Sequence, residues 1–206
     1  MNQILLIILG WLLGTLSPGV VEAISRNKRK AEVLRCVRAE LHDLRYKAAL
    51  VAHQLRVKTG TLARESLATS KRLIMHEGLP GDDGVASAAM RAALEQLGDD
   101  AYIANHNREG PKKPGFWPVP YEAPFLNVSL SHIALFTPTM QSALLRVRSE
   151  LHLFNHQVEF IKLLTERTFS LTGDNYQINQ GNLNGATTTL ITRADFLIQA
   201  IDALGD

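Results

Sequence analysis

The chain has 206 residues, of which 46% are hydrophobic and 20% are charged, and its net charge is +2. This length suits one folded domain, and the hydrophobic fraction is too low for a protein that crosses a membrane many times. The small basic excess is at odds with the clustered positive charge typical of nucleic-acid-binding proteins. With one cysteine, Cys36, the chain has no partner for an internal disulfide bond.

An apolar segment opens the chain. Residues 4–24 read ILLIILGWLLGTLSPGVVEAI and carry a single charge, at Glu22. A helix of this length spans about 31 Å, which is enough to cross the hydrocarbon core of a bilayer. We therefore expect residues 1–25 to form a single-pass transmembrane anchor, with a kink near Pro18.

Basic residues follow the apolar segment, and no Lys or Arg precedes it. Because cationic flanks stay on the cytoplasmic side, we expect the N-terminus outside the inner membrane and the rest of the chain in the cytoplasm. The same cations are candidates for binding anionic lipid headgroups. This basic run consists of Arg26, Lys28, Arg29 and Lys30.

Other interpretations of the N-terminal segment stay open. Val21-Glu22-Ala23 has small residues at the spacing of a signal-peptide cleavage site, although the segment lacks a basic start and is followed by dense positive charge. A buried helix of a soluble protein is a third interpretation. If the segment is an anchor, Gly10 and Gly14 are candidates for membrane self-association, because Gly-x-x-x-Gly lets a second helix approach closely.

Apolar residues then recur at alternating steps of three and four. This spacing predicts a long helix over residues 26–58 with a continuous apolar stripe. The stripe has two candidate partners: a second copy of the chain in a parallel homo-oligomer, or the chain's own C-terminal helices, which we favour. The stripe consists of Leu34, Val37, Leu41, Leu44, Ala48, Val51 and Leu55.

The middle of the chain predicts helices over residues 61–76 and 84–106, the second weakened at Gly98. A proline-rich loop follows over residues 108–124. Its aromatic residues suit either docking of a protein partner or a strap that closes the core, and we favour the strap. These aromatic candidates are Phe116, Trp117 and Tyr121. The apolar segment after the loop lacks an evident partner strand, and we expect it not to form one.

A helical hairpin is predicted over residues 138–204. Thr137 and Pro138 suit the N-cap and first position of its first helix. Three further apolar residues, Leu145, Phe160 and Leu163, widen the stripe of that helix and predict burial on more than one side. Residues 26–206 therefore form a helical-bundle domain in an all-α protein.

The sequence offers few residues for chemistry. His152, His156 and Glu159 lie at helical spacing and are weak candidates for a metal site, since a His-x-x-x-His pair supplies two ligands where zinc takes three or four. Nucleophile-elbow and phosphate-binding glycine motifs do not occur. We therefore predict no catalytic residue, metal or cofactor.

These features favour a non-enzymatic, membrane-anchored scaffold or sensor that binds a protein partner. A membrane-perturbing effector, such as a toxin or defence protein that oligomerises, is the alternative. An enzyme with an unrecognised site is the third hypothesis.

Overall fold

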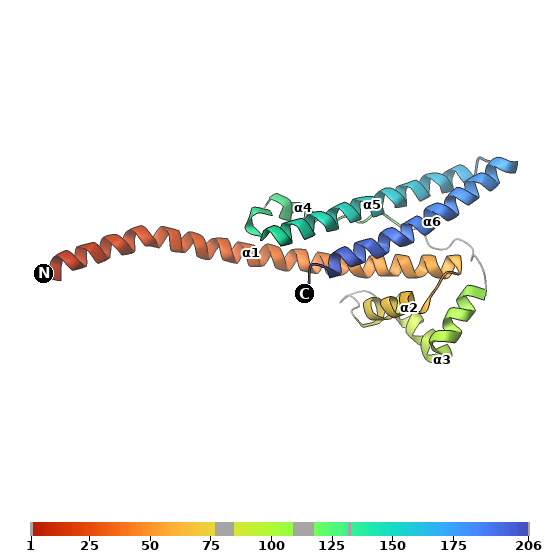
Figure 1. Ribbon diagram of the computed structural model, residues 1–206, viewed down its shortest axis with the longest axis horizontal. Helices are drawn as coiled ribbons and strands as arrows, with labels where there is room; N and C mark the ends of the chain where they lie inside the picture. The colour runs from red at the N-terminus through yellow and green to blue at the C-terminus, as the bar shows by residue number, and fades with distance from the viewer. Residues whose placement is uncertain (1, 77–84, 109–117, 132, 206) are drawn as a thin grey trace.

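The computed structural model is helical in every element that it describes, which confirms the all-α prediction (Figure 1). It describes residues 2–76, 85–108, 118–131 and 133–205. Within these ranges some side chains lie outside the description: those of residues 2–10, 12–19, 76, 85–87 and 128–131.

The longer helices are α1 (Asn2–Thr59), α3 (Val85–Arg108), α5 (Pro138–Thr168) and α6 (Gly173–Asp202). Shorter elements connect them: α2 (Arg64–Ser70), the π-helical turn η1 (Lys71–His76), α4 (Pro124–Ser131) and the 3₁₀ turn η2 (Ile133–Leu135). Two glycines mark breaks, as their positive φ angles are accessible mainly to glycine. Gly60 (φ 66°) ends α1, and Gly98 (φ 72°) divides α3 into two helical pieces.

Helix α1 has two halves with different surroundings. Its N-terminal half extends away from the other helices, and its C-terminal half lies in the bundle (Figure 1). The helix is unbroken through Pro18, so the predicted kink does not interrupt it. Trp11 and residues 20–29 are exposed. One continuous helix therefore joins the apolar N-terminal segment to the core.

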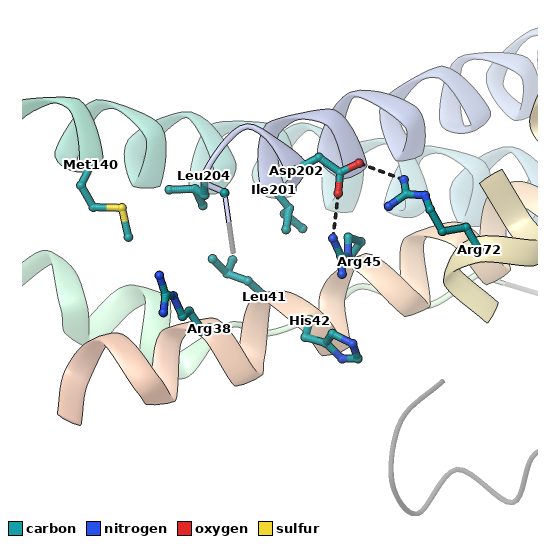
Figure 2. A pocket seen from close by; sticks show the side chains of 10 residues that line it. Arg38, Leu41, His42, Arg45, Arg72, Met140, Ile201, Asp202 and Leu204 are labelled. Atoms are coloured by element: carbon teal, nitrogen blue, oxygen red, sulfur yellow. Dashed lines mark hydrogen bonds and ion pairs between the residues drawn. The ribbon is translucent and has the colours of Figure 1, made fainter. Parts of the chain in front are cut away.

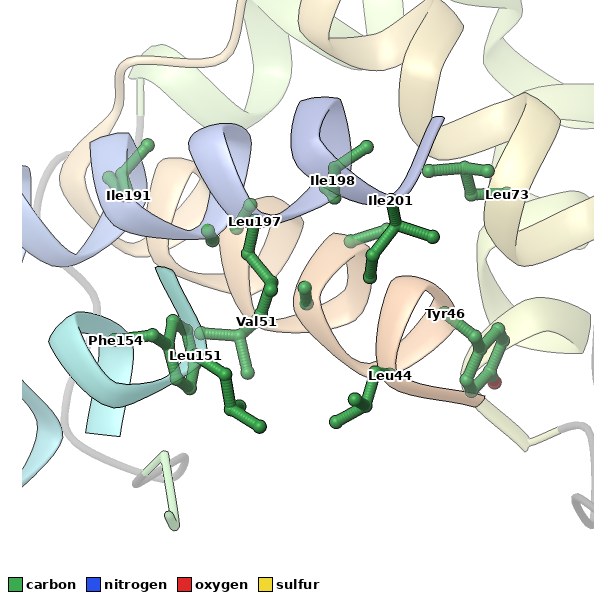
Figure 3. Close-up of a cluster of buried hydrophobic side chains, with 14 of the residues drawn as sticks. Leu44, Tyr46, Val51, Leu73, Leu151, Phe154, Ile191, Leu197, Ile198 and Ile201 are labelled. Carbon is green, nitrogen blue, oxygen red and sulfur yellow. The ribbon is translucent and has the colours of Figure 1, made fainter. Parts of the chain in front are cut away.

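The apolar stripe of residues 34–55, which we call the α1 stripe, packs against other parts of the same chain. All of its members from Val37 onward are buried, and they belong to one hydrophobic cluster with α5 and α6. Figure 3 shows Val51 of α1, Phe154 of α5 and Leu197 of α6 meeting within this cluster. Of the two partners considered for the stripe, the chain's own hairpin is the one observed.

Another side of α1 is buried as well, because α2, η1 and α3 pack on it. The buried residues on that side include Tyr46, Ala49 and Ala52.

Helices α5 and α6 form the predicted antiparallel hairpin and contact each other along their length. The Thr137 hydroxyl accepts a hydrogen bond from the Met140 N–H, which confirms the predicted N-cap. The prediction of burial on more than one side of α5 was wrong. Leu145, Phe160 and Leu163 are 47%, 42% and 43% exposed, because no described element covers the outer face of this helix.

The segment before α5 contains a helix and no strand in its described residues. Pro124 begins α4, as proline suits the first helical position. The Glu40 carboxylate of α1 accepts hydrogen bonds from the N–H groups of Phe125 (3.0 Å) and Leu126 (2.6 Å). Those donors have no partner within their own helix, and a carboxylate also favours the positive end of the helix dipole. Glu40 thus fixes α4 on α1.

We predict that Phe154→Ala lowers the free energy of unfolding by about 3–5 kcal/mol, because the side chain is fully buried between the helices of the core. Phe160→Ala on the outer face of the same helix is the matched control and should cost less than about 1 kcal/mol. Urea denaturation of the full chain in detergent, followed by circular dichroism, measures both values. Equal losses would contradict the assignment of the two faces.

Candidate functional site

The N-terminal segment is described mainly through its backbone. Gly10 and Gly14 lie on helix α1, and their surroundings are outside the described residues. Among the side chains that are described, no helix contains a stretch long and apolar enough to span a bilayer. The predicted anchor rests on residues 4–24, and most of their side chains lie outside the described part of the structure.

The basic run follows the apolar segment on the same helix, α1. Arg26, Lys28 and Arg29 are exposed and Lys30 is half-buried. Arg26 and Lys30 line a cavity of about 560 Å³ with Glu22 and Leu135. The run is therefore accessible to solvent along one helix.

A larger cavity lies further along α1, where the C-terminal end of α6 approaches it. Its volume is about 620 Å³, and α1, η1, α5 and α6 all contribute to its walls. We call it the arginine pocket, after Arg38, Arg45 and Arg72. Figure 2 shows Arg38 and Leu41 of α1 on one side of the cavity, with Met140 and Leu204 on the other.

One carboxylate organises the pocket. Asp202, in the last turn of α6, accepts a hydrogen bond from Arg45 Nη1 at 2.9 Å and another from Arg72 Nη2 at 3.1 Å (Figure 2). The Arg45 side chain is only 14% exposed, so its ion pair is screened less than a surface pair. A single residue of α6 thus joins α1 to η1 and brings two guanidinium groups to the same cavity.

A second ion pair joins the same helices. Arg56 Nη2 of α1 donates to Asp195 Oδ2 of α6 at 2.5 Å, and the Arg56 side chain is 15% exposed. Together with the Asp202 pairs, it sets the alignment of α6 along α1.

A buried polar cluster lies on another side of α1. His53 is 6% exposed, and its Nε2 is 3.1 Å from the hydroxyl of Tyr102 on α3. The Tyr102 ring also packs on His106, with 4.1 Å between ring centroids. Burial, together with the nearby His106 and Arg56, lowers the pKa of His53 to about 4. The buried imidazole is therefore neutral at physiological pH, and its Nδ1 has no hydrogen-bond partner in the described chain.

The predicted metal candidates are not brought into a site. His152, His156 and Glu159 are all exposed on α5. Within the described part of the chain, no group of three or more His, Cys, Asp or Glu side chains is placed to hold a metal ion.

Of the three aromatic candidates in the proline-rich loop, the structure describes one, Tyr121. Phe116 and Trp117 lie outside the described residues. Tyr121 is half-buried and stacks on Phe154 with 5.6 Å between centroids, and burial raises its pKa to about 12. Its backbone N–H donates to Asn155 Oδ1 (2.9 Å), and its carbonyl accepts from Asn155 Nδ2 (2.7 Å). At Tyr121, the segment lies on the core like a strap.

Sequence reasoning missed the arginine pocket because two of its elements are distant from α1 in the chain. A partial signal was present: Arg38, His42 and Arg45 recur at steps of four and three, so they lie along one side of the helix. Asp202 and Arg72 could not be placed beside them from spacing alone.

Comparison with known proteins finds no matching family model, no similar curated protein and no similar solved structure.

The neutral state of buried His53 makes the stability of the fold depend on pH. Below pH 6.5 the unfolded chain binds a proton that the folded chain does not, because the folded pKa is about 4. We predict that the free energy of unfolding falls by about 2 kcal/mol between neutral pH and pH 5, and by up to about 3 kcal/mol near pH 4. Urea denaturation at neutral pH and at about pH 5 measures the change. His53→Gln should reduce this pH dependence, whereas His152→Gln, at an exposed site, should leave it intact.

Proposed function

We propose that this chain is a membrane-anchored, non-enzymatic scaffold or sensor. In this proposal the apolar N-terminal segment is held in the inner membrane and the bundle lies on the cytoplasmic side. The observation that carries the proposal is the continuity of α1, in which the apolar segment, the basic run and the buried α1 stripe share one helix. A bundle attached in this way moves with its anchor.

The geometry of the hairpin supports an interaction role. The turn between α5 and α6 lies at the end of the molecule opposite the N-terminus (Figure 1). Exposed apolar side chains lie in and before this turn. They include Phe160 and Leu163 on α5, and Phe169, which is 87% exposed. Clustered exposed apolar residues of this kind often mark binding surfaces for proteins. An anchored bundle would present this surface away from the bilayer.

The anchor is tested by extraction of cell membranes with alkaline carbonate. The full chain should remain in the membrane pellet, because an apolar helix of about 20 residues is held by the hydrocarbon core. A variant without residues 2–25 should be released to the supernatant. Protease treatment of intact and opened cells then reports the side of the bundle, which should be cut only after the inner membrane is breached. Release of the full chain by carbonate would contradict the anchor.

The interaction role is tested by affinity capture from solubilised membranes with the Phe160→Ser, Leu163→Ser double variant. The variant should lose captured proteins, because polar side chains weaken apolar docking without disturbing the buried face of α5. Phe196→Ser, at an exposed position of α6, is the matched control. Identical protein sets from the wild-type chain and the double variant would contradict a docking role for this face.

A further inference from the structure

We infer that the arginine pocket binds a small, soluble, phosphorylated organic molecule of about the size of a nucleoside monophosphate. This inference goes beyond the anchored scaffold or sensor and does not depend on the anchor, because the pocket is built entirely from residues of the bundle. It follows from the charge, the shape and the position of the cavity.

Positive charge predominates among the described residues that line the pocket. Three arginines and one aspartate give a formal charge of +2 with His42 neutral. Asp202 pairs with both Arg45 and Arg72, so one carboxylate brings two guanidinium groups to the same wall of the cavity. Like charges held close together at a partly buried site favour the binding of an anion.

Arg38 supplies the charge best placed to bind that anion. It is exposed at the edge of the pocket, and it forms no hydrogen bond or ion pair with the described part of the chain. Figure 2 shows its guanidinium group directed toward the cavity, on the same side of α1 as Leu41 and Arg45. A guanidinium group presents paired N–H donors that match two phosphate oxygens, so phosphate is the anion these residues suit best.

The rest of the wall is apolar. Leu41 and Ile201 in this wall are buried, and Met140 and Leu204 are half-buried. A volume of about 620 Å³ falls in the range of small-molecule pockets and is far larger than an inorganic phosphate ion needs. The ligand therefore combines a phosphate group with an organic portion, such as a nucleoside or sugar, that covers the apolar wall.

The position of the pocket favours a soluble ligand over a lipid headgroup. Arg38 follows residue 25 by 13 residues, which corresponds to about 20 Å of helix. In an anchored chain the pocket therefore lies beyond the headgroup layer, whereas the basic run lies within it.

Calorimetric titration of the full chain in detergent tests the inference with adenosine monophosphate, uridine monophosphate and ribose 5-phosphate. Inorganic phosphate and unphosphorylated adenosine serve as reference probes. At least one organic phosphate should bind roughly tenfold or more tightly than either reference, and added salt should weaken its binding.

Variants assign the binding to the pocket. Arg38→Glu should weaken it roughly tenfold or more, and Arg38→Gln should weaken it to a smaller extent, because a charged donor is lost in both. Arg148→Glu makes the same charge change at an exposed position of α5 and should leave the affinity within about twofold. The inference is overturned if no organic phosphate binds more tightly than the references, or if the variants at Arg38 and Arg148 have equal effects.

A last arm distinguishes the source of the phosphate. The same titration in bicelles of zwitterionic lipid and of mixed anionic lipid should give equal affinities. If anionic lipid displaces the organic phosphate from the pocket, a headgroup is the ligand and the soluble-ligand proposal is wrong.

Discussion

Burial of the α1 stripe between the helices of the same chain is the packing on which the other elements depend. Val51 and its neighbours in the stripe contact the hairpin, while Tyr46 and Ala52 lie among the buried residues of the middle helices. Removing a helix that contacts α2, η1, α3, α4 and α6 would expose the inner faces of all five. Hydrophobic burial supplies most of the favourable free energy, and the ion pairs of Asp195 and Asp202 select one alignment of α6 along α1.

The same packing creates the candidate sites. Because α6 ends beside α1, Asp202 reaches both Arg45 and Arg72, and an arginine-lined cavity forms where four elements meet. The buried pair of His53 and Tyr102 results from α3 packing on another side of α1. Since α1 also carries the apolar segment and the basic run, a ligand in the pocket would contact the same helix that we propose to hold the protein in the membrane.

The sequence predicted elements whose signals are local and missed features that need distant neighbours. Thr137 and Pro138 mark the start of α5 through their own backbone chemistry, and the alternating steps of the α1 stripe reveal its buried face. Phe160 and Leu163 gave the same apolar signal, yet they are exposed, because periodicity cannot say whether a second helix is present to cover a face. The arginine pocket was not predicted, since it unites Arg38 with Asp202, which lies at the other end of the chain.

A cysteine crosslink between α1 and α6 tests the central claim most directly. Arg56→Cys and Asp195→Cys place one thiol on each helix, facing each other across the position of the present ion pair, in a chain whose natural cysteine is removed by Cys36→Ser. A short bifunctional maleimide spans the gap that the two longer side chains leave, and its reaction in native membranes should give a crosslink within one chain that migrates as a compact monomer. A covalent dimer, also formed when two differently tagged single-cysteine chains are mixed, would show that the α1 stripe packs between copies and would contradict the account.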